Sequence, residues 1–408
     1  MNKKAYKIYY WFNGIMFFAF WTNFAVNSLY QVRIAGLDAL QLVLVGTALE
    51  LTIFIFELPT GIVADIYSRR LSVIIGTFLI GLGFIVEGLF PSFIPILLAQ
   101  IIWGLGITFS SGALEAWLSD EVGEDGANQA FMKGAQIAEI GSFFGVIFGV
   151  LLGLIHLQLS VISGGFVFLL LGIILIKSMP EEGFSPAADQ NHNPISNIRS
   201  TIKTGAKVIR GRPIMISILL IGLIFGIYSE GLDRLWVAYL IESFTLPQIP
   251  EVILIGGIQA INMLLTAVVL GFAQKRLDVL RTPALVRSLT IISSTLIFSL
   301  LIFGQGRMLW FVIIFFWIIG ILRAVMYPMY KAWINKRIDS SVRATIFSLS
   351  SLMDAIGQIS GGPAIGGIAR RFSIRSGLLG STLLLTPVLP ILGNILAKAN
   401  KDKTKEQD

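Results

Sequence analysis

The chain has 408 residues, of which 55% are hydrophobic and only 13% are charged, and its formal net charge is +7. A soluble domain carries about 25% charged residues, so this composition excludes an ordinary soluble protein. The long apolar runs also exclude a transmembrane barrel, whose strands alternate in polarity. The absence of cysteine and the presence of only two histidines exclude a disulfide framework and a thiolate or histidine metal site.

Twelve apolar runs are each long enough to cross a bilayer, which needs about 20 residues. The first run continues past the length of a signal peptide without a clear cleavage site, so we interpret it as a membrane span. The predicted spans are residues 8–31, 41–64, 71–90, 93–117, 133–156, 158–177, 213–237, 251–273, 283–304, 308–333, 344–368 and 376–397.

The longest break between spans divides them six and six. We therefore predict an all-α polytopic membrane protein with two pseudo-symmetric six-helix halves, residues 1–177 and 213–397. A cytoplasmic linker (178–212) joins them, and a cytoplasmic tail (398–408) follows.

An internal repeat supports this division. Trp117 and Trp333 end corresponding spans, and one constant shift along the chain also relates Gly141 to Gly357 and Gly145 to Gly361. Two copies of a six-span unit, with the substrate site near the midplane, are a known transporter construction.

Loop charges predict the topology. Most of the 31 Lys and Arg fall in loops that are inside if both termini are cytoplasmic. The exception is the last outside loop, which holds Arg370, Arg371 and Arg375. We expect a multi-pass protein of a cell membrane, and we interpret this membrane as a bacterial inner or plasma membrane.

The short loop after the second span has a distinctive pattern. Residues 61–70 read Gly-Ile-Val-Ala-Asp-Ile-Tyr-Ser-Arg-Arg, where Gly61 would let backbones approach closely and Asp65 could accept hydrogen bonds from Arg69 or Arg70. This stretch resembles motif A of the major facilitator superfamily, although Ile66 and Ser68 depart from the family pattern. The resemblance implies that Gly61, Asp65, Arg69 and Arg70 form a conformational switch between the halves.

Two glycine-rich stretches can be interpreted either as helix-packing surfaces or as elements of the coupling mechanism. Gly141, Gly145, Gly149 and Gly153 form one small-residue helix face, which suits close packing. Residues 361–367 resemble motif C of bacterial drug–proton antiporters. In that family, however, the motif lies in span 5, not span 11.

Carboxylates inside the predicted spans are candidates for proton coupling. Each costs about 2.5–3.5 kcal/mol to insert, so such groups usually face a partner or a wet cavity. We predict that the coupling site is among Glu57, Glu139, Asp233 and Asp354, with static ion pairs as the alternative. Glu87 lies close to the outer end of its span, where we expect it to reach water, and it is not a candidate.

The resemblance implies a central cavity lined by spans 1, 4, 7 and 10. It places Arg323 in this cavity, where Asp233, Glu230 or Asp354 could neutralise it. Glu230 and Arg234 are four residues apart and can pair on one helix. The substrate-cavity candidates are Asn23, Asn27, Glu230 and Arg323.

The leading functional prediction is a secondary transporter for proton-coupled efflux of small amphipathic molecules or drugs by alternating access. The alternatives are a proton-coupled symporter for a nutrient or organic anion, and a non-transporting membrane sensor or scaffold. The expected partners are a small-molecule substrate, a proton or sodium gradient and the lipid bilayer, with no nucleic acid, no cofactor and a monomeric state. An enzyme is not expected, because no nucleotide-binding loop or catalytic constellation can be assembled.

Overall fold

The structure, a computed structural model, describes residues 3–186, 212–277, 282–338 and 340–405. Every regular element among them is a helix. Residues 187–211 of the predicted linker and 406–408 of the predicted tail lie outside the described residues. Two compact units can be distinguished. Unit 1 comprises Met1–Asn197 and Gln248–Gly257, and unit 2 comprises Ile198–Pro247 and Ile258–Asp408.

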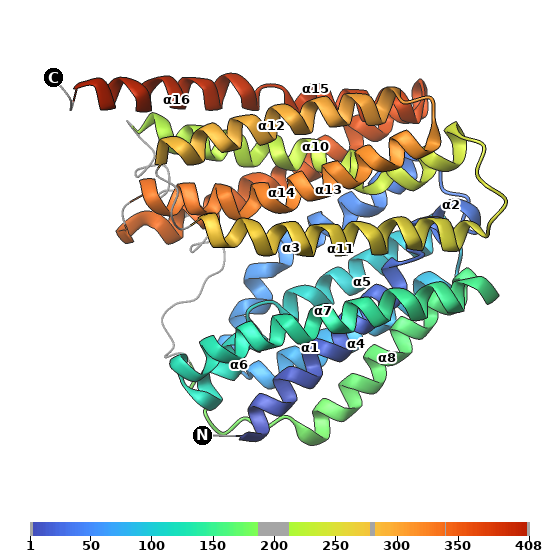
Figure 1. The fold of residues 1–408 in the computed structure, drawn as a ribbon. Coiled ribbons are helices and arrows are strands. Elements are labelled where there is room, and N and C mark those ends of the chain that lie inside the picture. The colour runs from blue at the N-terminus through green and yellow to red at the C-terminus, as the bar shows by residue number, and fades with distance from the viewer. Residues whose placement is uncertain (1–2, 187–211, 278–281, 339, 406–408) are drawn as a thin grey trace. The chain divides into compact units, whose positions relative to one another are not determined.

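The helices of the first half follow the predicted spans closely (Figure 1). They are α1 (Lys3–Phe24), α2 (Asn27–Arg33), α3 (Ala39–Ile66), α4 (Arg69–Leu89), α5 (Phe93–Ser110), α6 (Ala113–Val122), α7 (Glu124–Ile155) and α8 (Leu157–Ser178).

The second half contains α10 (Pro213–Ser243), α11 (Glu251–Leu277), α12 (Thr282–Gln305), α13 (Leu309–Arg337), α14 (Ser340–Arg371), α15 (Ile374–Leu385) and α16 (Val388–Lys405). Among the described residues, ten helical stretches are long and apolar enough to cross a membrane. Helices α1 and α14 occupy the positions of the other two predicted spans.

Local sequence explains where helices begin and break. The side chain of Asp38 accepts a hydrogen bond from the backbone N–H of Gln41, and the side-chain oxygen of Gln41 accepts one from the backbone N–H of Asp38. This capping box starts α3. Gly112 separates α5 from α6 at a φ of 70°, a conformation that favours glycine. Pro387 lacks the N–H that would continue α15, so α16 begins one residue later.

The same helix pairs pack in both units. In unit 1, α1 packs against α7 and α8, and α4 packs against α5 and α8. In unit 2, α10 packs against α14 and α15, while α12 packs against α13, α15 and α16. Trp117 and Trp333, the repeated tryptophans, are both buried. The repeat that the sequence predicted is therefore present in the helix packing.

The spaced glycines lie where helix backbones meet. A Cβ added at Gly141, Gly145 or Gly149 would collide with the main-chain carbonyls of Gly14, Phe18 and Thr22 on α1, which are also four residues apart. In unit 2, a Cβ at Gly361 of α14 would meet the carbonyl of Ile227 on α10. Close packing therefore accounts for the glycine face of α7 and for Gly361 in the motif C-like stretch.

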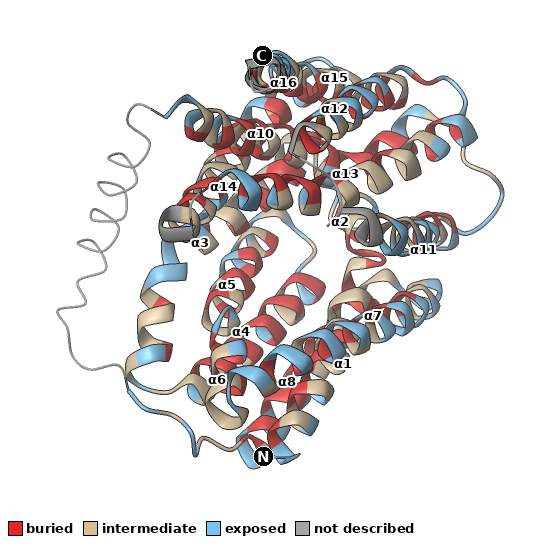
Figure 2. Cartoon of the chain, turned by 60° about the vertical axis from the view of Figure 1, so that its left-hand side comes forward, coloured by how far each residue is buried: buried red, intermediate tan, exposed pale blue. Residues whose placement is uncertain are grey.

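Buried residues form the inner side of each unit and apolar residues cover much of its outer side. Figure 2 shows buried and exposed positions alternating along the helices. Large side chains such as Phe144, Leu151 and Phe272 are exposed. A surface of this kind is suited to lipid, since lipid tails are as apolar as these side chains.

Candidate functional site

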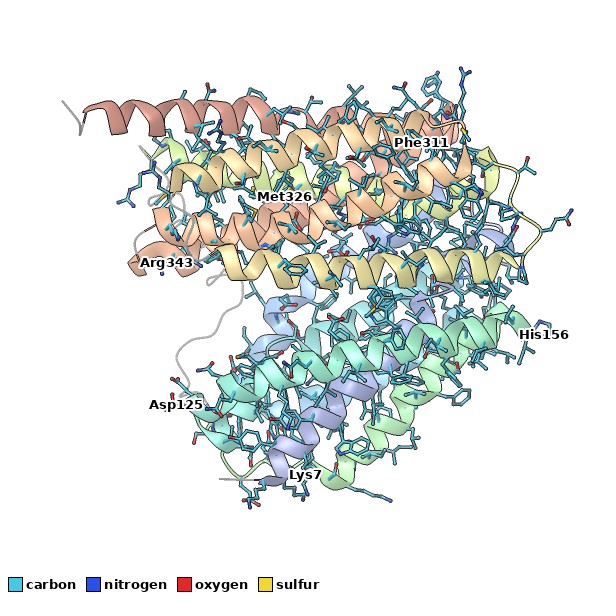
Figure 3. All side chains as sticks on the ribbon, in the orientation of Figure 1. Lys7, Asp125, His156, Phe311, Met326 and Arg343 are labelled. Carbon is cyan, nitrogen blue, oxygen red and sulfur yellow. The ribbon has the colours of Figure 1, made fainter. Side chains whose placement is uncertain are left out.

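A cavity of about 310 Å³ lies within unit 2, between α10, α13 and α14. Its apolar lining includes Phe225 and Tyr228 from α10, Met326 and Tyr327 from α13, and Phe347 from α14. Met326 is labelled in Figure 3, where it projects from α13 among the side chains of this unit. Aromatic walls with a few convergent polar groups are typical of small-molecule sites.

A bidentate ion pair lines this cavity. Arg323 donates from Nη1 to Oδ1 of Asp233 at 2.5 Å and from Nη2 to Oδ2 at 2.8 Å. The guanidinium also lies 5.8 Å from the ring centre of Tyr228. The side chain of Arg323 is 29% exposed and that of Asp233 is 46% exposed, so both groups remain accessible from the cavity. Asp233 is therefore the residue that neutralises Arg323 in this structure.

A second carboxylate, Asp354 of α14, lines the same cavity and is half-buried. Its Oδ2 accepts a hydrogen bond from Nε2 of Gln358 at 2.8 Å. Asp354 also lies within electrostatic range of Arg323. The cavity lining therefore contains two cations, Arg323 and Lys331, and two carboxylates, Asp233 and Asp354, of which Asp233 forms the ion pair with Arg323.

Glu230 lies in the unit interior and makes a different pair. It accepts a hydrogen bond from Nε of Arg234 at 3.4 Å, four residues further along α10, which confirms the pairing predicted from their spacing. Glu230 is only 4% exposed and is not among the residues that line the cavity. Glu230 therefore lies outside the lining of this cavity.

The motif A-like loop in unit 1 is a polar network. Arg69 pairs with Asp120 of α6, donates to the carbonyl of Ala116 at 2.9 Å, and lies 3.6 Å from Asp65. Because Arg69 is the first residue of α4, it joins α3, α4 and α6 at one end of the unit.

Ser68 and Arg70 of the same loop form hydrogen bonds with the end of α8 and the segment that follows it. Glu181 accepts hydrogen bonds from the hydroxyl of Ser68 at 2.9 and 2.7 Å and from the backbone N–H of Arg70 at 2.9 Å. Nη2 of Arg70 donates to the carbonyl of Ile176 at 2.6 Å. Ser68, which departs from the family glycine, thus caps α4 and binds Glu181.

Three other residues that the sequence singled out, Gly61, Glu57 and Glu139, do not line the unit 2 cavity. A Cβ added at Gly61 would meet no atom within 4 Å, so the expectation of close backbone approach there is wrong. Glu57 is exposed and accepts a hydrogen bond from Ser111 at 2.9 Å. Glu139 is exposed on α7, whereas Asp354, its near-equivalent in the repeat, lines the cavity.

The main correction concerns Glu87, which the sequence placed in contact with water. It is 1% exposed and accepts hydrogen bonds from Asn27 and Gln31. Asn23 and Asn27, predicted to face the substrate cavity, instead lie in this buried cluster, where Asn27 donates to Asn23. The signal that pointed to a buried partner was the polar stripe of Asn23, Asn27 and Gln31, which an apolar span must satisfy internally.

Comparisons with known proteins identify the family. The model of the Major Facilitator Superfamily matches residues 10–362. The chain belongs to this superfamily. It is also 27% identical over 376 residues to the uncharacterized MFS-type transporter YxaM of Bacillus subtilis (strain 168), which covers 91% of this chain and 90% of the relative.

Solved structures share the fold. The nucleoside transporter NupG has a TM-score of 0.76 at 12% identity, covering 97% of this chain and 99% of NupG. A bacterial homolog of the human lysosomal transporter Spinster has a TM-score of 0.74 at 12% identity, covering 96% of each chain. The predicted transporter fold of this MFS protein, with two pseudo-symmetric six-helix halves, is therefore confirmed.

Proposed function

We propose that this MFS protein transports small amphipathic molecules through the unit 2 cavity and exports them in exchange for protons. The observation that carries the proposal is the placement of Asp233, Arg323 and Asp354 around one aromatic-lined space. The aromatic rings suit the apolar part of a substrate, and the charged groups suit its polar part.

The carboxylates provide a route to proton coupling. Protonation of Asp233 would remove one half of its ion pair and leave Arg323 available to another anion. Asp354 lies in the same cavity, so its carboxylate could serve as that partner or carry the proton itself. Alternating access would then change the surroundings of both groups and with them their affinity for a proton.

The switch role of the loop at 61–70 is part of the same proposal. The network of Asp65, Arg69 and Asp120 consists of partly exposed pairs, which are weak individually and can exchange partners. We infer that this network opens and reforms as the transporter changes conformation. Glu57 and Glu139 remain secondary candidates for the proton path, because each presents an exposed carboxylate on a membrane helix.

A second candidate function is proton-coupled uptake of an organic anion. It is favoured by the guanidinium of Arg323, which lines the cavity and can bind a carboxylate with two parallel hydrogen bonds. In this alternative, protonation of Asp233 breaks its ion pair with Arg323, and the guanidinium of Arg323 then binds the substrate.

Proton fluxes in inverted membrane vesicles test the proposal. An inside-acid gradient is followed with a fluorescent dye while amphipathic drugs and common metabolites are added one at a time. A compound that collapses the gradient with the parent chain, but not with Asp354→Asn, supports proton exchange through this cavity. If no compound collapses the gradient while whole cells accumulate an organic anion in a proton-dependent manner, export is wrong and uptake takes its place.

A further inference from the structure

Unit 1 contains a buried polar cluster that the proposed function does not use. Its centre is the carboxylate of Glu87 on α4, which is 1% exposed. Oε1 of Glu87 accepts hydrogen bonds from Nδ2 of Asn27 at 3.0 Å and from Nε2 of Gln31 at 2.8 Å. Oε2 accepts one from Nε2 of Gln100 on α5 at 3.2 Å. Three uncharged amides thus converge on one carboxylate.

Two amide groups in this cluster are not fully satisfied. Gln100 is 2% exposed and Asn23 is 0% exposed. Oε1 of Gln100 and Nδ2 of Asn23 are buried without a hydrogen-bond partner. A buried polar atom left without a partner is destabilising, because it has lost its hydrogen bonds to water. Because Gln100 donates to Glu87 through Nε2, its Oε1 is an oxygen next to the carboxylate that the internal hydrogen bonds do not use.

The amides can present oxygen as readily as nitrogen. Each side-chain amide carries both an N–H donor group and a carbonyl oxygen, and turning the group by half a rotation exchanges them in nearly the same space. The carboxylate of Glu87, together with the carbonyl oxygens of Gln100, Gln31 and Asn27, then forms a set of hard oxygen ligands. Oxygen ligands of this kind bind hard cations.

The charge of this ligand set indicates which kind of cation it fits. Its one carboxylate contributes a single negative charge, and its other members are neutral amides. Among the described residues, no three His, Cys, Asp or Glu side chains are grouped so that they could hold a metal ion by themselves, so amide oxygens must supply the other ligands here. A monovalent ion balances this charge, whereas a divalent ion would leave an excess positive charge in the membrane.

The helix geometry at the cluster is also that of an ion site. The first span is broken between Phe24, where α1 ends, and Asn27, where α2 begins, and the cluster residues Asn23 and Asn27 flank this break. Tyr30 of α2 donates to the main-chain carbonyl of Glu87 at 2.5 Å. Interrupted membrane helices supply the ends at which transporters coordinate sodium ions.

Aromatic side chains keep this site dry. Phe84 of α4 and Trp103 of α5, each about one turn from a cluster residue, are buried with ring centres 5.7 Å apart. Phe20 and Phe24 of α1 pack against both rings. An ion in the cluster would exchange its water shell for protein oxygens, and this exchange discriminates between ions by size.

We propose that Glu87, Asn23, Asn27, Gln31 and Gln100 form a binding site for one sodium ion. The bound ion joins both sides of the break in the first span to α4 and α5, and so stabilises one conformation of unit 1. This inference concerns residues of unit 1 alone and does not depend on proton exchange in the unit 2 cavity.

The test uses the purified full chain in detergent at fixed pH and ionic strength. Thermal unfolding is measured in sodium chloride, potassium chloride and choline chloride, and binding of ²²Na⁺ is measured directly. We expect sodium to raise the melting temperature more than choline does, with a single saturable ²²Na⁺ site. Glu87→Gln should abolish both effects. Glu115→Gln is the matched control because Glu115 is an exposed carboxylate in the same unit, and it should retain both effects.

A second variant covers the case in which Glu87→Gln does not fold. Gln100→Met removes one ligand oxygen at similar volume and should weaken ²²Na⁺ binding by about tenfold or more, the size typical of lost groups around a metal. The proposal is wrong if sodium and choline act alike on the parent chain. It is also wrong if the parent chain shows no saturable ²²Na⁺ binding, or if Glu87→Gln responds to sodium as Glu115→Gln does.

Discussion

The ion pair of Asp233 and Arg323 offers the most quantitative test of the unit 2 cavity. The perturbation is Asp233→Asn, which keeps the shape of the side chain and removes its charge. Asn can still accept one hydrogen bond from Arg323 through its remaining oxygen, but the second oxygen becomes an N–H₂ group that faces another donor. The variant therefore loses the bidentate geometry as well as the charge attraction.

The size of the loss follows from the geometry and the exposure. Two unit charges about 4 Å apart attract by about 4 kcal/mol at an effective dielectric constant near 20. The side chains are 29% and 46% exposed, so solvent screens the pair and part of this energy is offset by desolvation. We expect Asp233→Asn to lower the free energy of unfolding by about 2 kcal/mol, the range for a hydrogen bond to a charged group.

A double-mutant cycle measures this energy. Asp233→Asn, Arg323→Gln and the double variant are unfolded by denaturant in detergent, with tryptophan fluorescence as the readout. We expect a coupling energy of about 1–2 kcal/mol, and a double variant more stable than the sum of the single losses predicts. Glu139→Gln, an exposed carboxylate, is the control and should change stability by less than about 0.5 kcal/mol. A coupling energy below that value would refute the reasoning.

Three further outcomes are expected. Asp354→Asn should abolish substrate-driven proton flux in vesicles while leaving the melting temperature within a few degrees of the parent, and a variant with full proton flux would remove this carboxylate from the coupling path. Gly145→Leu should lower the free energy of unfolding by about 1–3 kcal/mol or more, because its side chain would enter the backbone of α1; an unchanged unfolding curve would contradict the close packing. Arg69→Gln should lower the free energy of unfolding by about 1 kcal/mol, because it removes the partly exposed ion pair with Asp120. The same denaturant unfolding measures this loss, and Asp120→Asn should lower the free energy of unfolding by no more than Arg69→Gln if the pair accounts for the effect.

The sequence by itself determined the membrane spans, the two halves and the local pairs. Span positions follow from composition because a bilayer requires about 20 apolar residues and a helix that satisfies its own backbone. The Glu230–Arg234 pair was predictable because residues four apart on a helix are neighbours. The glycine face of α7 was predictable as a packing surface for the same geometric reason, although the sequence did not name α1 as its partner.

Only the tertiary structure decided which partners meet across helices. Arg323 had three carboxylates available in the sequence, and the packing of α10 beside α13 within unit 2 selected Asp233. Glu87 lies near the end of its span, a position that predicts contact with water. However, amide side chains of α2 and α5 cover it, and it is buried. Position along a helix tells how deep a residue lies in the membrane. Burial depends on which neighbouring helix covers it, and that is decided by contacts between residues far apart in the chain.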